Sequence, residues 1–403
     1  MQIVSGFVLV AIVAVGLWVL LGKQMREWRT WRATATPLAS IIGSGFLVVA
    51  PLLAVTVGAW APVAMLGIVL LAYGIGAVIR YQIRYAEPLL EGAKSGVLLQ
   101  IERVSGLALA VAYVVSVAFY VRLLASFAMR PFHLAAPVIY EQVLTTLILG
   151  FIGGWGAWRG LRSLESLEDI AVGVKLSIIA ALLVALAVFD GLGAFSGSIQ
   201  MPTSVIADPV RAARVLAGLL LVVQGFETSR YLGAEYDPEL RIRTMAASQW
   251  LTGVIYVGFV ALCVPLMVEL SGPPDETAII GMTAEVHPVL PVLLVVAALM
   301  SQFSAAVADT LGGGGLLHQL TGGRVKEGYG YLLLVGLAIA LVWFADIFQV
   351  ISLASRAFAS YYLLQAVSAL LIANRRCERG HAVAFGLLAA LLGMVVIFAV
   401  PAG

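Results

Sequence analysis

The sequence SIIGSGF at residues 40–46 and the sequence QGFETS at residues 224–229 determine the architecture that we expect for this chain. Each places glycine and polar side chains in the middle of a long apolar run. A glycine in a helix interior costs about 1 kcal/mol relative to alanine, and lipid tolerates unwound backbone only where it faces protein or a wet cavity. The two stretches therefore predict membrane helices that are broken near their middle, where free peptide groups can bind a ligand.

The composition is that of a membrane protein. Of the 403 residues, 62% are hydrophobic and 11% are charged, whereas a soluble domain has about 25% charged residues. The net charge of +2 is too small to indicate a nucleic-acid partner, and two cysteines imply no disulfide framework. The sequence has neither a P-loop pattern nor an HExxH pattern, so we expect no ATP hydrolysis, no zinc site and no enzyme activity.

Apolar runs predict about twelve transmembrane helices, because each run is near the roughly 20 residues that cross a bilayer. They cover residues 3–22, 37–57, 60–80, 104–128, 138–157, 170–189, 210–233, 245–269, 289–317, 329–344, 347–373 and 382–400. Lys and Arg gather in alternate loops, namely 23–36, 81–103, 158–169, 234–244, 318–328 and 374–381. Basic loops stay in the cytoplasm, so we predict a multi-pass protein of the cell (inner) membrane with both termini outside.

The two broken runs stand at corresponding places in the chain. Five runs (37–189) are followed by five more (210–373), and each set begins with its broken run. Because five is odd, the two sets lie in the membrane with opposite orientation, as in the inverted repeats of secondary transporters. We therefore expect an extra N-terminal helix with a basic loop at 1–33, two five-helix repeats at 34–190 and 191–373, and a C-terminal helix at 374–403.

Four motifs, in this order and spacing, resemble the amino acid–polyamine–organocation (APC) superfamily, whose members have the LeuT-type five-plus-five fold. IIGSGF is similar to the first core helix, SLEDIAVGVKLSII (166–179) to the fifth, QGFETSRYLGAEYDPELRIR (224–243) to the sixth with its following loop, and AALMSQFSAAVADTLGGGGLL (297–317) to the eighth. The extra N-terminal run and RYLGAEYDPELR resemble the solute:sodium symporter branch. The Lys of the fifth helix and the G-F-E resemble the amino acid permeases.

The resemblance implies a solute site and an ion site. Peptide N–H groups of the first break would bind a substrate carboxylate or another acceptor, and carbonyls of the second break would bind a substrate amine, with Phe226 as a lid or wall. Sodium-coupled relatives usually have adjacent hydroxyl residues at the cation position, whereas this chain has Ser301 followed by Gln302. The implied solute-site residues are Gly43, Ser44, Gly45, Gln224, Gly225 and Phe226, and the implied ion-site residues are Ala298, Ser301 and Gln302. The alternative for Gly43 and Gly45 is helix packing through small residues, which needs no ligand.

Two ionisable residues stand at membrane depth beside these motifs. A Lys at the centre of a membrane helix costs about 2.5–3.5 kcal/mol, so Lys175 either couples transport to protons in place of a sodium ion or extends its stem to the cytoplasmic face. Glu227 lies within the second break. We expect it to bind a substrate amine or carry a proton, and the alternative is an ion pair that fixes the break.

Other polar residues within the runs are assigned structural roles. For Asp309, Arg122 and Arg356 we expect buried ion pairs with one another or with other charged residues. Tyr113 and Tyr120 are expected to be packing or interface aromatics.

The leading hypothesis is a secondary active transporter of a small organic solute, an amino acid or a similar molecule, working by alternating access and coupled to H⁺ or Na⁺. Its partners would be this solute and the lipid bilayer, and no cofactor is expected besides the coupling ion. An ion or metal-ion carrier or channel is a second hypothesis, although the first break offers only Ser40 and Ser44 as metal ligands. A third is a membrane sensor that has kept a transporter fold without transport. The sequence indicates no oligomeric state.

Overall fold

The computed structural model describes residues 6–400 apart from residues 44, 91–95, 130–137, 203–205, 207, 234 and 270–276, and apart from the side chains of 162–169, 221 and 269. All regular elements in these residues are helical. The first part of the chain forms α1 (Gly6–Leu20), α2 (Lys23–Glu27), α3 (Arg29–Ile41), α4 (Gly45–Val57), η1 (Gly58–Trp60), α5 (Ala61–Tyr81), η2 (Gln82–Ala86), α6 (Glu87–Leu90), α7 (Val97–Met129), α8 (Val138–Arg159) and α9 (Arg162–Ser196). The second part forms α10 (Pro209–Gly218), η4 (Leu220–Val223), η5 (Phe226–Leu232), α11 (Pro238–Cys263), η6 (Val264–Glu269), α12 (Ala278–Val286), α13 (Val289–Leu320), α14 (Glu327–Phe344), α15 (Ile347–Arg375) and α16 (Arg379–Phe398).

The helices reproduce the apolar runs of the sequence. Among the described residues, nine helical stretches are long and apolar enough to cross a membrane, the first being Gly45–Leu90. Gly45–Leu90 covers most of the predicted run 37–57 and all of the run 60–80, and the runs at 3–22 and 210–233 are absent from the nine. The described part of α1 has 15 residues, and the run at 210–233 is divided into the short elements α10, η4 and η5. The run at 37–57 is likewise divided between α3 and α4, so both predicted breaks interrupt helices.

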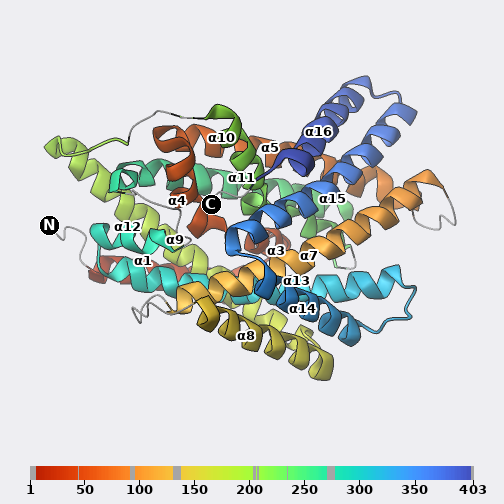
Figure 1. Cartoon of the computed structure of the whole chain (residues 1–403), viewed down its shortest axis with the longest axis horizontal. Helices are drawn as coiled ribbons and strands as arrows, with labels where there is room; N and C mark the ends of the chain where they lie inside the picture. The colour runs from red at the N-terminus through yellow and green to blue at the C-terminus, as the bar shows by residue number, and fades with distance from the viewer. Residues whose placement is uncertain are drawn as a thin grey trace.

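The helices lie roughly along one long axis (Figure 1). The beginning of α1 lies at one end of this axis, near α12, and the turns that join α13 to α14 and α15 to α16 lie at the other end. We call the latter end the basic end, because its loops carry the Lys and Arg residues noted above. Inside the bundle α7 packs against both α13 and α15, while α8 packs against α14 and α1 against α9.

Two arginines, the buried Arg122 and the half-buried Arg356, bind the ends of helices. The Arg122 guanidinium donates to the Val342 carbonyl at 3.1 Å and to the Ala345 carbonyl at 3.0 Å, at the end of α14. Arg356 donates to the Ala399 carbonyl, which caps α16. The last carbonyls of a helix have no intrahelical partner and carry partial negative charge, so a cation stabilises them. The prediction of ion pairs is thus wrong for these two arginines in the described part of the chain.

Candidate functional site

The first break separates α3 from α4. The backbone leaves the helical region at Ile42 (φ −81°, ψ 60°), whose N–H donates to the Leu38 carbonyl at 3.0 Å. Gly43 follows, Ser44 lies outside the described residues, and α4 begins at Gly45. The first N–H groups of α4 have no intrahelical acceptor, so this end of the helix can bind an anionic group.

The second break lies between η4 and η5. Gly225 has φ +115°, a backbone conformation that side chains with a Cβ rarely adopt. Upstream, the Ser355 hydroxyl of α15 donates to the Gly218 carbonyl at the end of α10, at 2.5 Å. The run that the sequence predicts as one span is therefore divided into α10 and the two 3₁₀-helices η4 and η5, with Gln224 and Gly225 between η4 and η5.

The two breaks are in direct contact. A Cβ on Gly45 would lie 2.5 Å from the Val222 Cα, and a Cβ on Gly225 would lie 2.3 Å from the Ser40 hydroxyl oxygen. The buried Tyr256 hydroxyl of α11 contacts the carbonyls of Ile41 at 3.0 Å and Val222 at 2.8 Å, one from each break. The glycines therefore permit an approach of two unwound backbones, which supports a shared site rather than two independent kinks.

The side chains of the second break are held by α7 and α15. The Glu227 carboxylate accepts the Gly225 N–H at 2.9 Å and the Tyr362 hydroxyl at 2.6 Å. Phe226 stacks on Tyr362 with ring centroids 5.3 Å apart. The Gln224 Nε2 donates to the Tyr120 hydroxyl at 3.0 Å, while its buried Oε1 has no partner in the described part of the chain.

The predicted ion-site residues lie beside the first break. The Lys175 side chain is only 2% exposed and its ammonium donates to the Ala39 carbonyl near the end of α3. It therefore points into the protein rather than extending to a membrane face. The Ser301 hydroxyl of α13 donates to the Ile42 carbonyl at 3.4 Å. Ala298 and Gln302 are fully buried, and both amide atoms of Gln302 are without hydrogen-bond partners among the described residues.

A cavity of about 550 Å³ adjoins the two breaks, between α3, η5, α7 and α13. Ser40 and Thr228 line it next to the breaks, and Tyr113 and Asp309 line its wall. The Asp309 carboxylate accepts a hydrogen bond from the Ser116 hydroxyl of α7. The exposed side chains of Arg32, Glu235 and Gln319 also line the cavity, close to the basic loops, so the cavity opens toward the basic end.

The cavity includes residues to which the sequence analysis gave other roles. Tyr113 lines it and Tyr120 contacts Gln224, although both were expected to be packing or interface aromatics. Asp309 lines it as well, and the ion pair expected for Asp309 stays a prediction. None of the predicted solute-site or ion-site residues that the structure describes is among the lining residues; Gly43, Gly225, Phe226 and Glu227 lie close in the chain to Ser40 and Thr228, which are. In the sequence, the only feature that could have pointed to Ser40 and Thr228 as cavity-lining residues was that each carries a hydroxyl group within one of the two broken stretches.

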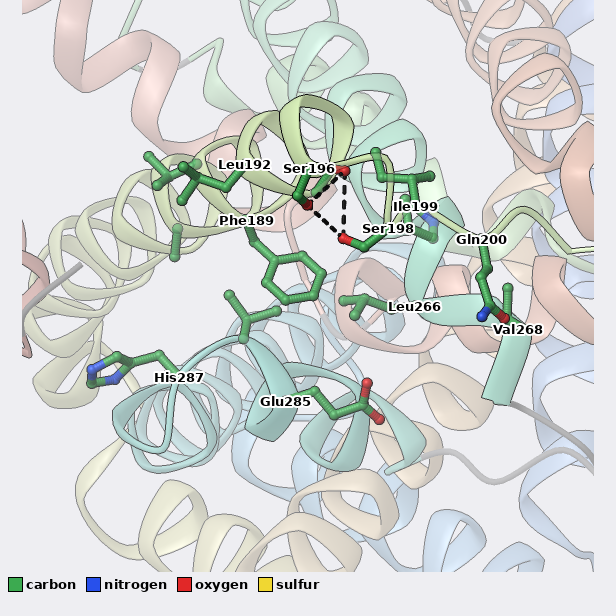
Figure 2. A pocket seen from close by; sticks show the side chains of 15 residues that line it. Phe189, Leu192, Ser196, Ser198, Ile199, Gln200, Leu266, Val268, Glu285 and His287 are labelled. Atoms are coloured by element: carbon green, nitrogen blue, oxygen red, sulfur yellow. Dashed lines mark hydrogen bonds between the residues drawn. The ribbon is translucent and has the colours of Figure 1, made fainter. Parts of the chain in front are cut away.

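A second cavity, of about 410 Å³, lies near the opposite end of the bundle (Figure 2). It is bounded by the end of α9, by η6 and by α12. Figure 2 shows Ser196 and Ser198 on one side and Glu285 and His287 on the other. The two serine hydroxyls are 2.8 Å apart and both donate to the Gly193 carbonyl. None of the predicted site residues lines this cavity.

The helix order and the paired breaks define the class as a membrane transporter with the LeuT-type fold. The chain is similar to the substrate-bound, outward-open structure of a Na⁺-coupled sialic acid symporter, with a TM-score of 0.54 over 98% of this chain and 96% of that chain. Sequence identity is 13%, so this likeness establishes the fold alone.

The chain belongs to the APC superfamily transporter family, whose model matches residues 23–399. It is also 45% identical over 386 residues to an uncharacterized protein of Aquifex aeolicus (strain VF5), covering 94% of this chain and 93% of that protein. The predicted family and fold class are thereby confirmed, as are a multi-pass membrane protein and, at the level of class, a secondary transporter.

Proposed function

We propose that the protein transports a small organic solute with an amine and an acceptor group, an amino acid or a similar molecule, by alternating access. The observation that carries this proposal is the contact of two broken helices beside a cavity that is open at one end. The first N–H groups of α4 suit a carboxylate. The Glu227 carboxylate suits an ammonium group, as does the Gln224 Oε1, which has no hydrogen-bond partner among the described residues.

The coupling ion in this proposal is a proton carried by Lys175. Its ammonium donates to the Ala39 carbonyl, and Ser301 binds the neighbouring Ile42 carbonyl. The Lys175 ammonium thus places a positive charge beside the first break. In addition, Gln302 stands where sodium-coupled relatives usually have a second hydroxyl residue. Sodium coupling is the competing outcome and is tested below.

The proposed orientation follows from the basic loops. Placing the basic end in the cytoplasm, according to the positive-inside rule, puts both termini outside the cell membrane. The cavity then opens to the cytoplasm, so the structure corresponds to an inward-open state of the cycle.

A thermal-unfolding screen of the purified protein tests the solute class. The probes are the twenty standard amino acids, each with and without NaCl against a choline chloride control, at pH 5.5 and pH 7.5. A ligand at one hundred times its Kd stabilises the folded state by about 2.7 kcal/mol, so a substrate raises the unfolding temperature. Counterflow of the same labelled amino acid in proteoliposomes then separates a transporter from a sensor. If no amino acid shifts the transition under any condition, the proposed solute class is wrong.

Lys175→Ala tests the coupling ion. For the amino acid that the screen identifies, we expect uptake by wild-type proteoliposomes to depend on an inward proton gradient and uptake by the variant to lose at least tenfold of that stimulation. Counterflow, which needs no net proton movement, should be affected less. Unchanged proton stimulation in the variant would remove Lys175 from the proposal, and stimulation of the wild type by sodium alone would replace the proton.

A further inference from the structure

The 3₁₀-helix η5 has two distinct faces. In a 3₁₀-helix, residues i and i+3 are eclipsed, so Glu227 and Arg230 share one face. Thr228 and Tyr231, which also stand three residues apart, share another face and line the cavity together with Leu232. One side of this short helix is therefore a wall of the cavity, and another is turned into the protein.

The inward face of η5 is bound by two residues of α15 with the same spacing. The Tyr362 hydroxyl donates to the Glu227 carboxylate at 2.6 Å, and Arg230 donates to the Gln365 Oε1 at 2.7 Å. Three residues rise roughly 4.5 Å along an α-helix and roughly 6 Å along a 3₁₀-helix, so the spacings of the two pairs differ by only about 1.5 Å, which the side chains can span. We call these two pairs the α15 rungs.

The second rung is anchored to three further elements. Gln365 donates to the Ser105 hydroxyl of α7 at 2.6 Å. Arg230 lies 3.1 Å from Glu102 of α7 and 4.0 Å from Glu87 of α6. Arg241 of α11 forms a bidentate salt bridge with Glu87 and also donates to the Arg230 carbonyl at 2.9 Å.

These contacts balance two arginines with two carboxylates around an Arg230 side chain that is almost completely buried. A buried charge that lacks its partners is strongly destabilising, so Arg230 remains at this position while the cluster is intact. Its neighbour three residues earlier is Glu227, which binds the Gly225 N–H at the break itself. The position of the break is thus connected through η5 to the ionic cluster.

We propose that Arg230 and Gln365 are positioning residues of the solute site: together with the Tyr362–Glu227 rung, they hold η5, and with it the Gly225 break and one wall of the cavity, in a fixed place. The effect of these residues on transport rests on the proposed function. Their effect on the position of η5 can be measured in the protein without solute.

The test is hydrogen–deuterium exchange of the full-length protein in lipid nanodiscs without any solute. We expect Gln365→Leu and Tyr362→Phe each to accelerate amide exchange in peptides covering 224–232 by about tenfold. Tyr362→Phe keeps the ring that stacks on Phe226 and removes only the hydroxyl. Ser360→Ala is the matched control on α15, because its hydroxyl bonds the Arg356 carbonyl within the same helix; it should leave exchange at 224–232 unchanged.

Arg230→Gln is the more direct variant, but it leaves Glu102 and Glu87 without that cation and can fail to fold. Gln365→Leu keeps every charge and therefore decides the question. The double variant Tyr362→Phe/Gln365→Leu should accelerate exchange by less than the product of the two single effects, because either loss already releases η5. Unchanged exchange at 224–232 in both single variants overturns the proposal.

A transport readout separates this inference from the proposed function. For an amino acid that stabilises the wild type, Gln365→Leu should raise the half-saturating concentration about tenfold with little change in maximal counterflow rate, and Ser360→Ala should change neither. If no amino acid binds the wild type but exchange accelerates as expected, the positioning role stands and the solute assignment falls. If the half-saturating concentration is unchanged in Gln365→Leu while the maximal rate collapses, the residue has another role.

Discussion

Gly45 stands so close to the second break that a single methyl group there would collide with backbone. A Cβ would lie 2.5 Å from the Val222 Cα and 2.8 Å from the Val222 carbonyl oxygen, and neither atom can rotate away as a flexible side chain would. Overpacking of this kind typically costs about 1–3 kcal/mol. Gly45→Ala should therefore lower the thermal unfolding temperature in detergent and separate the two breaks.

Gly154→Ala is the matched control for this prediction, because no atom of the described residues lies within 4 Å of a Cβ at that position in α8. Alanine is the better helix former, so the control should unfold at the wild-type temperature or slightly above it. Equal stability of the two variants would contradict the close contact between the breaks.

The sequence showed readily which glycines belong to the candidate site. It did not show which aromatic residues do. SIIGSGF and QGFETS stand out because glycine and polar residues are unfavourable at membrane depth. Tyr113 and Tyr120 do not stand out, because lipid and protein interior are both apolar and a membrane helix needs no polar outer face. The rotation of α7 that turns Tyr113 toward the cavity is therefore not encoded in a periodic pattern. The role of Arg122 was hidden for another reason, since its acceptors lie 220 and 223 positions along the chain.

At the scale of elements, α11 connects the two broken helices through one hydroxyl group. Tyr256 contacts a carbonyl of each break, and its ring packs edge-on against Phe46 of α4 with centroids 5.4 Å apart. Tyr256→Phe keeps the packing and leaves two buried carbonyls without this donor. An unsatisfied buried polar group costs about 1–3 kcal/mol, so we expect a lower unfolding temperature and faster amide exchange around both breaks.

The control for this substitution is Tyr329→Phe, which removes a hydroxyl from a side chain that is 67% exposed. It should have no measurable effect on either readout. A Tyr256→Phe protein as stable as wild type, with unchanged exchange near residues 41 and 222, would show that the hydroxyl does not hold the breaks together.

The apolar runs and the alternation of basic loops were sufficient to predict the order of these elements, because each run follows from the thickness of the bilayer. They were not sufficient to predict that the half after Gly225 is a 3₁₀-helix. That geometry depends on contacts with α15, which comes more than a hundred residues later, and no local pattern around 226–232 reports them.

For the molecule as a whole, the cavity between α3, η5, α7 and α13 predicts one-sided access. Ala308 of α13 lines it and is partly exposed. In a background with the exposed Cys377 replaced by Ser, Ala308→Cys should react with a membrane-impermeant maleimide at least tenfold faster in inside-out vesicles than in right-side-out cells. A cysteine at Trp158, which is 73% exposed at the basic end of α8 and away from the cavity, serves as the control for vesicle orientation and should also react from the cytoplasmic side. Faster labelling from the outer side would reverse the assigned opening.

The added first helix has a consequence for how the protein meets its lipids. The family match begins at residue 23, directly after α1, and α1 packs against α9. A Cβ on Gly16 would lie 2.5 Å from the Ser177 hydroxyl oxygen, and a Cβ on Gly173 would lie 2.8 Å from the Leu21 side chain. On α9 these close contacts are made at Gly173 and Ser177, each two residues from Lys175. In a protein shortened to remove α1, lipid acyl chains would have to fill these grooves and would lie against the part of α9 that carries the buried Lys175.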